Sequence, residues 1–338
     1  MDQGLTKSAV YLTDPVGATD NRAIPAFNSS TSRATRRFEN AWKVRQMTEF
    51  VTFEEGRIAC DVVGDGPLVV LSHGIGTSRH DYRHLVPRLT AAGYRVVNAD
   101  LRGHGESSPG WPSVTGKPAI SRTDVAGDLL SVIRHFGGPA VIVGHSLSGG
   151  AATIAAAEAP ELVSAIVEIN PFTRRQRLDF GALWTVPRYR RGLVRLMGTL
   201  LLGSPRLWRR YLDIAYPTKP EDFPNYLDGV FSTLREPGRW REFRKTGKTT
   251  PVDAEAALSE VHRPALVIMG AEDPDFPDPK AEAMAIVAAM PMGIGKVAVI
   301  ENGGHYPHAQ FGDRVAELII PFLGRHAAGV VAPVRHAR

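Results

Sequence analysis

The segment Gly144-His145-Ser146-Leu147-Ser148 places a serine between small residues. It follows the apolar run 140–143 and precedes an Ala-rich stretch, so it marks a turn from a strand into a helix. Such a turn bends sharply and exposes the hydroxyl, and bulky neighbours would clash with it. Ser146 is therefore the candidate nucleophile. The second flanking position, usually Gly, is Ser148, which is still small enough for the turn.

A serine hydroxyl needs a base to attack, and the base needs an orienting acid. Asp273 follows the apolar run 266–269, and His305 follows the run 297–300 on a Gly-Gly loop. The order nucleophile, acid, histidine is the one in which a strand-to-helix serine finds its partners. The sequence therefore predicts acyl transfer by Ser146, His305 and Asp273.

The alternatives for the base and the acid lie close by. His308 is three residues beyond His305. The loop around Asp273 holds three more acidic residues, namely Glu272, Asp275 and Asp278. Two polar residues, Glu168 and Asn170, end the preceding apolar run and offer another place for the acid, but an asparagine carries no charge to stabilise an imidazolium.

The developing negative charge on the substrate oxygen needs two N–H donors. The stretch Ser72-His73-Gly74-Ile75-Gly76 follows the apolar run 68–71, where one donor is expected, and we assign it to the N–H of Ile75. The N–H of Leu147, directly after the nucleophile, is the second predicted donor.

Short apolar runs separated by helix-length segments must position these residues. The runs are 68–71, 96–99, 140–143, 165–169, 266–269 and 297–300. Runs that are apolar at every residue fit strands covered on both faces, as in a parallel sheet with crossover helices. Helical spacing is visible over 122–136 and 313–323, and residues 50–53 and 58–63 flank a Glu-Gly turn as a hairpin. The fold class is α/β.

Two regions lie outside this alternation. Residues 1–46 are polar and rich in turn-forming residues, so we expect a loosely ordered arm that could support a homo-oligomer. The segment 171–257 is predicted to be a mainly helical insertion, and it is basic, since positions 171–250 hold 17 Lys and Arg against 7 Asp and Glu. The predicted core is then 47–170 and 258–326.

The motifs together resemble the α/β-hydrolase fold superfamily, in particular its lidded serine esterases and C–C hydrolases. They are the His73-Gly74 loop, the turn at 100–107, the serine turn, and the loops of Asp273 and His305, spread in family order over residues 68–323. The resemblance implies a mostly parallel eight-stranded sheet with helices on both faces. It also implies that residues 171–257, after the sixth strand, form a cap over the active site.

Composition excludes several kinds of site. The single cysteine, Cys60, cannot form an internal disulfide or a cysteine metal cluster. We expect no metal and no cofactor, because the chain lacks metal-ligand spacing and a dinucleotide-binding glycine motif. The net charge of +5 comes without a nucleic-acid recognition motif, so no nucleic acid partner is predicted.

No apolar run is long enough to span a membrane, and the first 25 residues lack the apolar core of a secretion signal. We therefore expect a cytoplasmic protein without integral membrane contact. The basic insertion could still attract anionic substrates or lipid headgroups, although a solvated cap face is the simpler interpretation.

The predicted substrate is a small molecule, an ester or lactone, that enters under the cap. We expect contacts from His73, Gly74, His145, Trp184 and Trp208, with packing or loop support as the alternative for His73 and His145. The other functions left open are C–C bond hydrolysis of a β-diketone or vinylogous diketone, and ligand binding without turnover. A serine nucleophile disfavours epoxide hydrolase and haloalkane dehalogenase, whose relatives attack through an aspartate.

Overall fold

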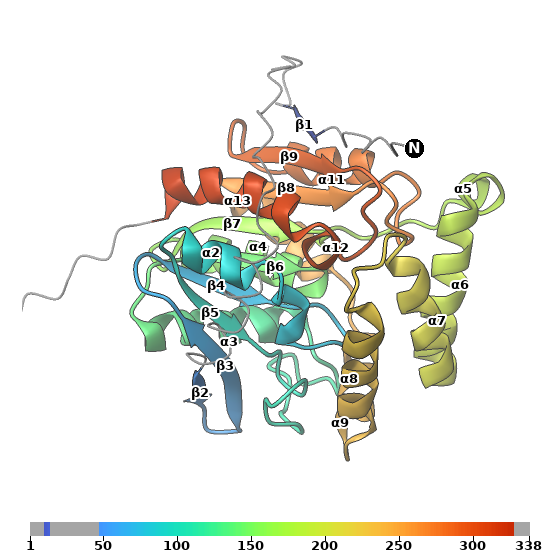
Figure 1. The fold of residues 1–338 in the computed structure, drawn as a ribbon, viewed down its shortest axis with the longest axis horizontal. Coiled ribbons are helices and arrows are strands. Elements are labelled where there is room, and N and C mark those ends of the chain that lie inside the picture. The colour runs from blue at the N-terminus through green and yellow to red at the C-terminus, as the bar shows by residue number, and fades with distance from the viewer. Residues whose placement is uncertain (1–9, 14–46, 328–338) are drawn as a thin grey trace, which may run out of the picture.

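The computed structural model describes residues 10–13 and 47–327, and its centre is one twisted sheet (Figure 1). Nine strands of the described chain lie in the order β1-β9-β8-β7-β6-β4-β5-β3-β2. Neighbouring strands from β5 through β4 to β9 pair in parallel, while β2, β3 and β1 add antiparallel pairs at the two ends. The predicted mostly parallel sheet is confirmed.

The strands coincide with the predicted apolar runs, extended by one or two residues at most ends. The five central strands, β4 to β8, are buried along nearly their whole length, as expected for a sheet covered on both faces. Their bounds are β2 Met47–Thr52, β3 Arg57–Val63, β4 Leu68–Ser72, β5 Arg95–Ala99, β6 Ala140–His145, β7 Val163–Ile169, β8 Ala265–Gly270 and β9 Gly295–Ile300.

One strand was not predicted. β1, Val10–Thr13, lies within the arm and pairs antiparallel with β9, so the sheet has nine strands where eight were expected. The sequence there is rich in strand-forming residues, and pairing covers the otherwise open edge of β9. The rest of the predicted arm, and with it the predicted oligomer contact, lies outside the described residues.

Helices cover both faces of the sheet, as predicted (Figure 1). α3 (Arg122–Phe136), α4 (Leu147–Glu158) and α11 (Pro279–Ala288) contribute to the apolar cluster on one face. On the other face, α2 (Val86–Ala91) and α13 (Gly312–His326) pack in a second cluster. No helix in the described part of the chain is long and apolar enough to cross a bilayer.

The segment between β7 and β8 is made of helices and loops, and we call residues 171–257 the proposed cap. A third apolar cluster joins Trp208, Phe231 and Phe243 to Tyr306, the residue after His305. In contrast, Ala254, in the last helix of this segment, belongs to the apolar cluster to which α3, α4 and α11 contribute. The helices are α5 Phe180–Thr185, α6 Pro187–Leu202, α7 Pro205–Ala215, α8 Phe223–Arg235, α9 Arg239–Thr246 and α10 Val252–Ala257.

A buried ion cluster fixes the loops that follow β4 and β5. Arg79 binds Asp61 through Nε at 2.7 Å and Asp100 through Nη1. Asp100 also accepts hydrogen bonds from the backbone N–H groups of Arg79, at 2.8 Å, and Glu106, at 2.9 Å. A Cβ at Gly105 would lie 2.0 Å from the Asp100 carboxylate, which explains the glycine.

We expect Asp100→Ala to lower the free energy of unfolding by about 3 kcal/mol, because it leaves a buried guanidinium short of one charge and two backbone donors without an acceptor. Urea denaturation measures this. Glu106→Ala is the matched control, since Glu106 binds the same guanidinium with a side chain that is 59% exposed, and it should cost less than about 1 kcal/mol. Equal losses in the two variants would contradict the role given to Asp100.

Candidate functional site

Ser146 lies on a strained turn between β6 and α4. Its φ is 55°, in the left-handed region that residues other than glycine rarely adopt. A Cβ at Gly144 would lie 2.2 Å from the carbonyl oxygen of Ser148, so the turn requires glycine there. The Ser146 N–H donates to the carbonyl of Ile169 at 2.9 Å, which ties the turn to the end of β7. This is the backbone conformation that the sequence predicted.

The departure from the usual turn pattern, Ser148, is accommodated by two hydrogen bonds. Its hydroxyl donates to the carbonyl of His73 at 2.6 Å and lies 2.9 Å from the Ser72 hydroxyl. The extra side chain therefore links the serine turn to the loop after β4. That loop touches the serine directly, because a Cβ at Gly74 would lie 2.9 Å from the Cβ of Ser146.

The two predicted oxyanion donors lie on these adjoining segments. Among the described residues, neither the N–H of Ile75 nor that of Leu147 donates to a backbone carbonyl. Leu147 is the first residue of α4, where helix N–H groups have no partner within the helix. Both N–H groups thus lack a backbone acceptor in the described chain, as their predicted role requires.

His305 and Asp273 meet at the carboxyl ends of β9 and β8. Nδ1 of His305 donates to Oδ2 of Asp273 at 2.9 Å, which leaves the lone pair of the neutral ring on Nε2. The ring of His305 lies 4.8 Å from that of His145, the neighbour of Ser146. The structure therefore brings the predicted base and acid together beside the serine turn, and all three side chains are buried.

Asn170 has a role that the sequence analysis did not find. Its amide nitrogen donates to Oδ2 of Asp273 and to the carbonyl of Gly304, and its oxygen accepts from the N–H of Gly270. It thus connects the ends of β7 and β8 to the His305 loop and fixes the Asp273 carboxylate. Its φ of 44° suits asparagine, which tolerates this region better than most residues.

A second carboxylate faces the histidine. Oδ2 of Asp275 lies 3.4 Å from Nδ1 of His305 and accepts a hydrogen bond from the hydroxyl of Tyr211 on α7. The Asp275 N–H donates to Oδ1 of Asp273 at 2.9 Å. In the sequence, Asp275 is one of several acidic neighbours of Asp273, and its spacing of two residues from Asp273 was the available signal.

The pKa values of Asp275 and His305 depend on their burial and on the charged groups close to them. Burial raises the pKa of Asp275, and the neighbouring Asp273 charge raises it further, against the opposing effect of His305. Burial alone would lower the pKa of His305, but the charges of Asp273 and Asp275 together bring that pKa above its ordinary value. The two carboxylates therefore stabilise the charged form of this imidazole more than water would.

The proposed cap contacts the loop that carries Asp273 and Asp275. The guanidinium of Arg188, on α6, donates to the carbonyls of Asp273 and Phe276. Gly192 packs so closely that a Cβ there would lie 2.4 Å from the carbonyl oxygen of Pro274. α6 is thus in direct contact with the loop of Asp273 and Asp275 over one helical turn.

The predicted substrate contacts have different outcomes. Trp184 was expected in the site; its side chain is 83% exposed on α5, which does not support that prediction. Trp208 is buried, and its indole N–H donates to the carbonyl of Gly76 at 3.3 Å over the loop after β4. The difference arises because the two residues lie on different cap helices, one facing solvent and one facing the core.

Both predicted histidine contacts support the loops. Nδ1 of His73 donates to the carbonyl of Gly74 at 2.7 Å, and its Nε2 accepts from the N–H of Leu101 at 3.0 Å. His145 Nε2 donates to the carbonyl of His305 at 2.8 Å. These bonds occupy both ring nitrogens of His73, so the loop-support alternative describes it better than substrate contact.

Two clusters of buried side chains could each offer three ligand atoms to a metal ion. One is Asp273, Asp275 and His305; the other is Asp81, His145 and His308, with ligand atoms within 4.8 Å of one another. Each group joins residues that are far apart in the sequence, which is why residue spacing did not reveal them. The absence of a metal remains the prediction for both groups, and His305 in the first group already donates to Asp273.

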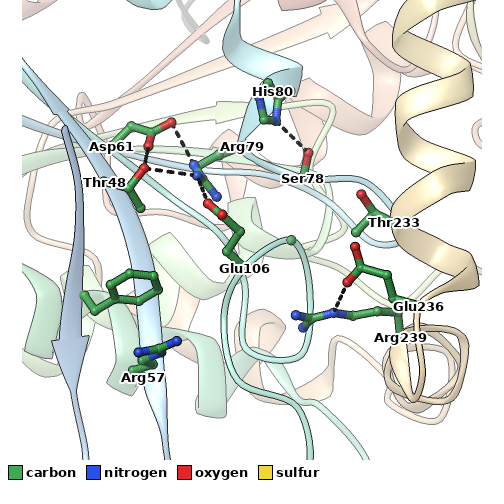
Figure 2. Close-up of a pocket in the computed structure, with 12 residues that line it drawn as sticks. Thr48, Arg57, Asp61, Ser78, Arg79, His80, Glu106, Thr233, Glu236 and Arg239 are labelled. Carbon is green, nitrogen blue, oxygen red and sulfur yellow. Dashed lines mark hydrogen bonds and ion pairs between the residues drawn. The ribbon is translucent and has the colours of Figure 1, made fainter. Parts of the chain in front are cut away.

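A polar cleft of about 750 Å³ lies elsewhere on the surface. Figure 2 shows it between the β2–β3 hairpin, the turns at Arg79 and Glu106, and the adjoining ends of α8 and α9. Its charged groups pair among themselves, Arg79 with Asp61 and Glu106, and Arg239 with Glu236. None of the predicted site residues lines it, so it is separate from the site of the serine turn.

Comparison with known proteins adds three findings. The model of the alpha/beta hydrolase family matches residues 69–318. The magnesium-chelatase 30 kDa subunit of Rhodobacter capsulatus is 29% identical over 276 residues, which are 77% of this chain and 87% of that protein. Epoxide hydrolase B of Mycobacterium tuberculosis is 31% identical over 174 residues, 51% of this chain and 43% of that protein.

Among solved structures, a putative lipase from Acinetobacter baumannii superimposes with a TM-score of 0.66. It is 20% identical, and the match covers 89% of this chain and 98% of that one. At this identity the likeness concerns the fold, which the two chains share over nearly their whole length.

We expect Asp275→Asn to lower the pKa of His305, because it removes one of the two negative charges that raise that pKa. NMR titration of the labelled imidazole measures the shift. Glu272→Gln, in the same loop but with a side chain 52% exposed, is the control and should leave the titration unchanged. An unaltered or raised pKa in the Asp275 variant would contradict this electrostatic assignment.

Proposed function

Because the chain belongs to the alpha/beta hydrolase family, we propose that it is a serine hydrolase that cleaves a carboxylic ester or lactone. The observation that carries the proposal is the hydrogen bond from His305 Nδ1 to Asp273, formed beside the strained turn of Ser146. That bond orients the ring so that Nε2 can accept a proton.

In the proposed reaction, the hydroxyl of Ser146 attacks the substrate carbonyl while Nε2 of His305 takes its proton. The N–H groups of Ile75 and Leu147 stabilise the oxyanion. The imidazolium then protonates the leaving alcohol, which departs to give the acyl-enzyme. Water, deprotonated by His305, hydrolyses the acyl-enzyme and restores the serine.

The surroundings of the histidine suit its charged intermediate. Asp273 and Asp275 stabilise the imidazolium that forms after proton transfer, since both carboxylates lie within 3.4 Å of Nδ1. Asn170 is a positioning residue, because it touches Asp273 and acts through it. Tyr211 brings a contact from the proposed cap to the same carboxylate pair.

Substrate access in this proposal requires movement of cap side chains. Ser146 and His305 are each only 3% exposed; Trp208 and Tyr211 stack on each other, and the Tyr211 ring lies 6.5 Å from that of His305. An aromatic cover of this kind favours an apolar acyl or alcohol group and excludes water from the intermediate.

One observation favours a different class of function. The relative that covers 77% of the chain is named as a chelatase subunit, not as a hydrolase. Ligand binding without turnover therefore stays open as an alternative, beside C–C bond hydrolysis. The similarity to an epoxide hydrolase does not favour that reaction here, because a serine occupies the turn where those relatives use an aspartate.

The remaining predictions concern location and partners. A small-molecule substrate follows from the proposed reaction. Cytoplasmic location and the absence of a nucleic acid partner stay predictions from composition, as does self-association through the N-terminal arm.

We expect Ser146→Ala to lower kcat for p-nitrophenyl acetate by about 10⁴-fold or more, because the nucleophile is lost while the fold is kept. A fluorophosphonate probe should label the native protein at Ser146 and leave the variant unlabelled. Ser131→Ala, which removes a serine on α3, is the control and should retain both activity and label.

The same assay separates the alternatives. Inertness toward esters combined with cleavage of a vinylogous diketone would replace ester hydrolysis by C–C bond hydrolysis. If folded native protein takes no label and turns over neither substrate class, the proposal of catalysis is wrong and ligand binding takes its place.

A further inference from the structure

An apolar surface on α5 and α6 has no partner within the described chain. Its large side chains point to solvent, with Trp184 83% and Leu202 77% exposed. Single exposed apolar residues are ordinary, but a contiguous group on neighbouring elements indicates an interaction site. We call it the α5–α6 face; its apolar members are Phe180, Trp184, Val194, Met197, Leu201 and Leu202.

Three of these side chains form a stripe along α6. Val194, Met197 and Leu201 follow at helical intervals of three and four, so they share a side of α6. Arg190, one turn earlier on that side, donates to the carbonyl of Leu183 at 3.2 Å. This bond joins the stripe to the end of α5, where Trp184 lies.

The fold does not account for this surface. The opposite side of α6 buries Tyr189, Gly192 and Thr199 against the rest of the molecule. The two helices stand at the edge of the molecule, away from the sheet (Figure 1). The exposed stripe is therefore the outer side of a helix whose inner side already packs.

The charge of the segment around the stripe indicates which kind of partner covers it. Residues 177–215 contain eight arginines and two acidic residues, Asp179 and Asp213. Asp213 pairs with Lys219, and Asp179 caps α5. A second copy would bring the same positive charge to the contact, which opposes a symmetric dimer. An anionic surface, by contrast, complements this charge.

We propose that the α5–α6 face docks on a lipid bilayer that carries anionic headgroups. α6 is about 24 Å long at 1.5 Å per residue and lies in the plane of the surface, with its apolar stripe at the boundary of the acyl chains. Arg190 and Arg191, both exposed on α6, supply positive charge for the phosphates, and the exposed tryptophan suits the interface.

Co-sedimentation with vesicles tests the proposal on the full chain. We expect binding to phosphatidylcholine vesicles in which every third lipid is phosphatidylglycerol, weakened several-fold by about 0.5 M NaCl, and little binding to phosphatidylcholine alone. Trp184→Glu and Leu201→Glu should each reduce the partition coefficient by about tenfold, because each replaces a buried apolar contact with a charge of the wrong sign.

The control is Met292→Glu, which introduces the same charge at a side chain that is 90% exposed and outside the face. It should bind within about twofold of the native chain. Circular dichroism melting shows whether each variant folds. Quenching of tryptophan fluorescence by brominated lipid should fall in Trp184→Phe, which keeps an apolar ring.

Three outcomes would overturn the proposal: no binding to anionic vesicles, equal loss in the Met292 control, or self-association of the native chain that Trp184→Glu abolishes without lipid. The last would make the face a contact between copies. Turnover of a soluble ester by these variants reports on the proposed hydrolysis separately, so failure of docking and failure of catalysis are distinguished.

Discussion

The hydrogen bond between His305 and Asp273 is the interaction on which the proposed chemistry depends, and the sheet makes it possible. The two residues are 32 positions apart, yet β8 and β9 are parallel neighbours, so the loops at their carboxyl ends meet. Ser146 reaches the same edge because β6 lies two strands away from β8 in the same sheet. The parallel pairing of the strands thus determines that the three residues lie at one edge of the sheet, whatever the directions of their side chains.

The sequence predicted those parts of the fold that depend on local pattern. Strands buried on both faces give uninterrupted apolar runs, and α3 has the bounds that its apolar spacing indicated. The serine turn was equally predictable, because Gly144 and the residues around it must be small. β1 was missed, since its pairing partner β9 lies near the opposite end of the chain, and local pattern does not reveal so distant a contact.

The parts of the site that escaped prediction depend on side-chain direction. Asp275 resembles any acidic neighbour until Tyr211, from another element, donates to it. Asn170 was weighed only as an alternative acid, whereas its amide joins two loops through three hydrogen bonds. Trp184 and Trp208 looked equivalent in the sequence, and only the direction in which their helices face separates them.

The contact between Gly192 and Pro274 constrains how the proposed cap can open. α6 is fastened to the aspartate loop by this close approach and by the guanidinium of Arg188. Lifting α6 would move the carboxylates of Asp273 and Asp275 away from the imidazole of His305 and so prevent the proposed proton transfer. For the proposed reaction we therefore expect substrate to enter by movement of cap side chains that leaves α6 in place, so that the proposed catalytic residues keep their alignment.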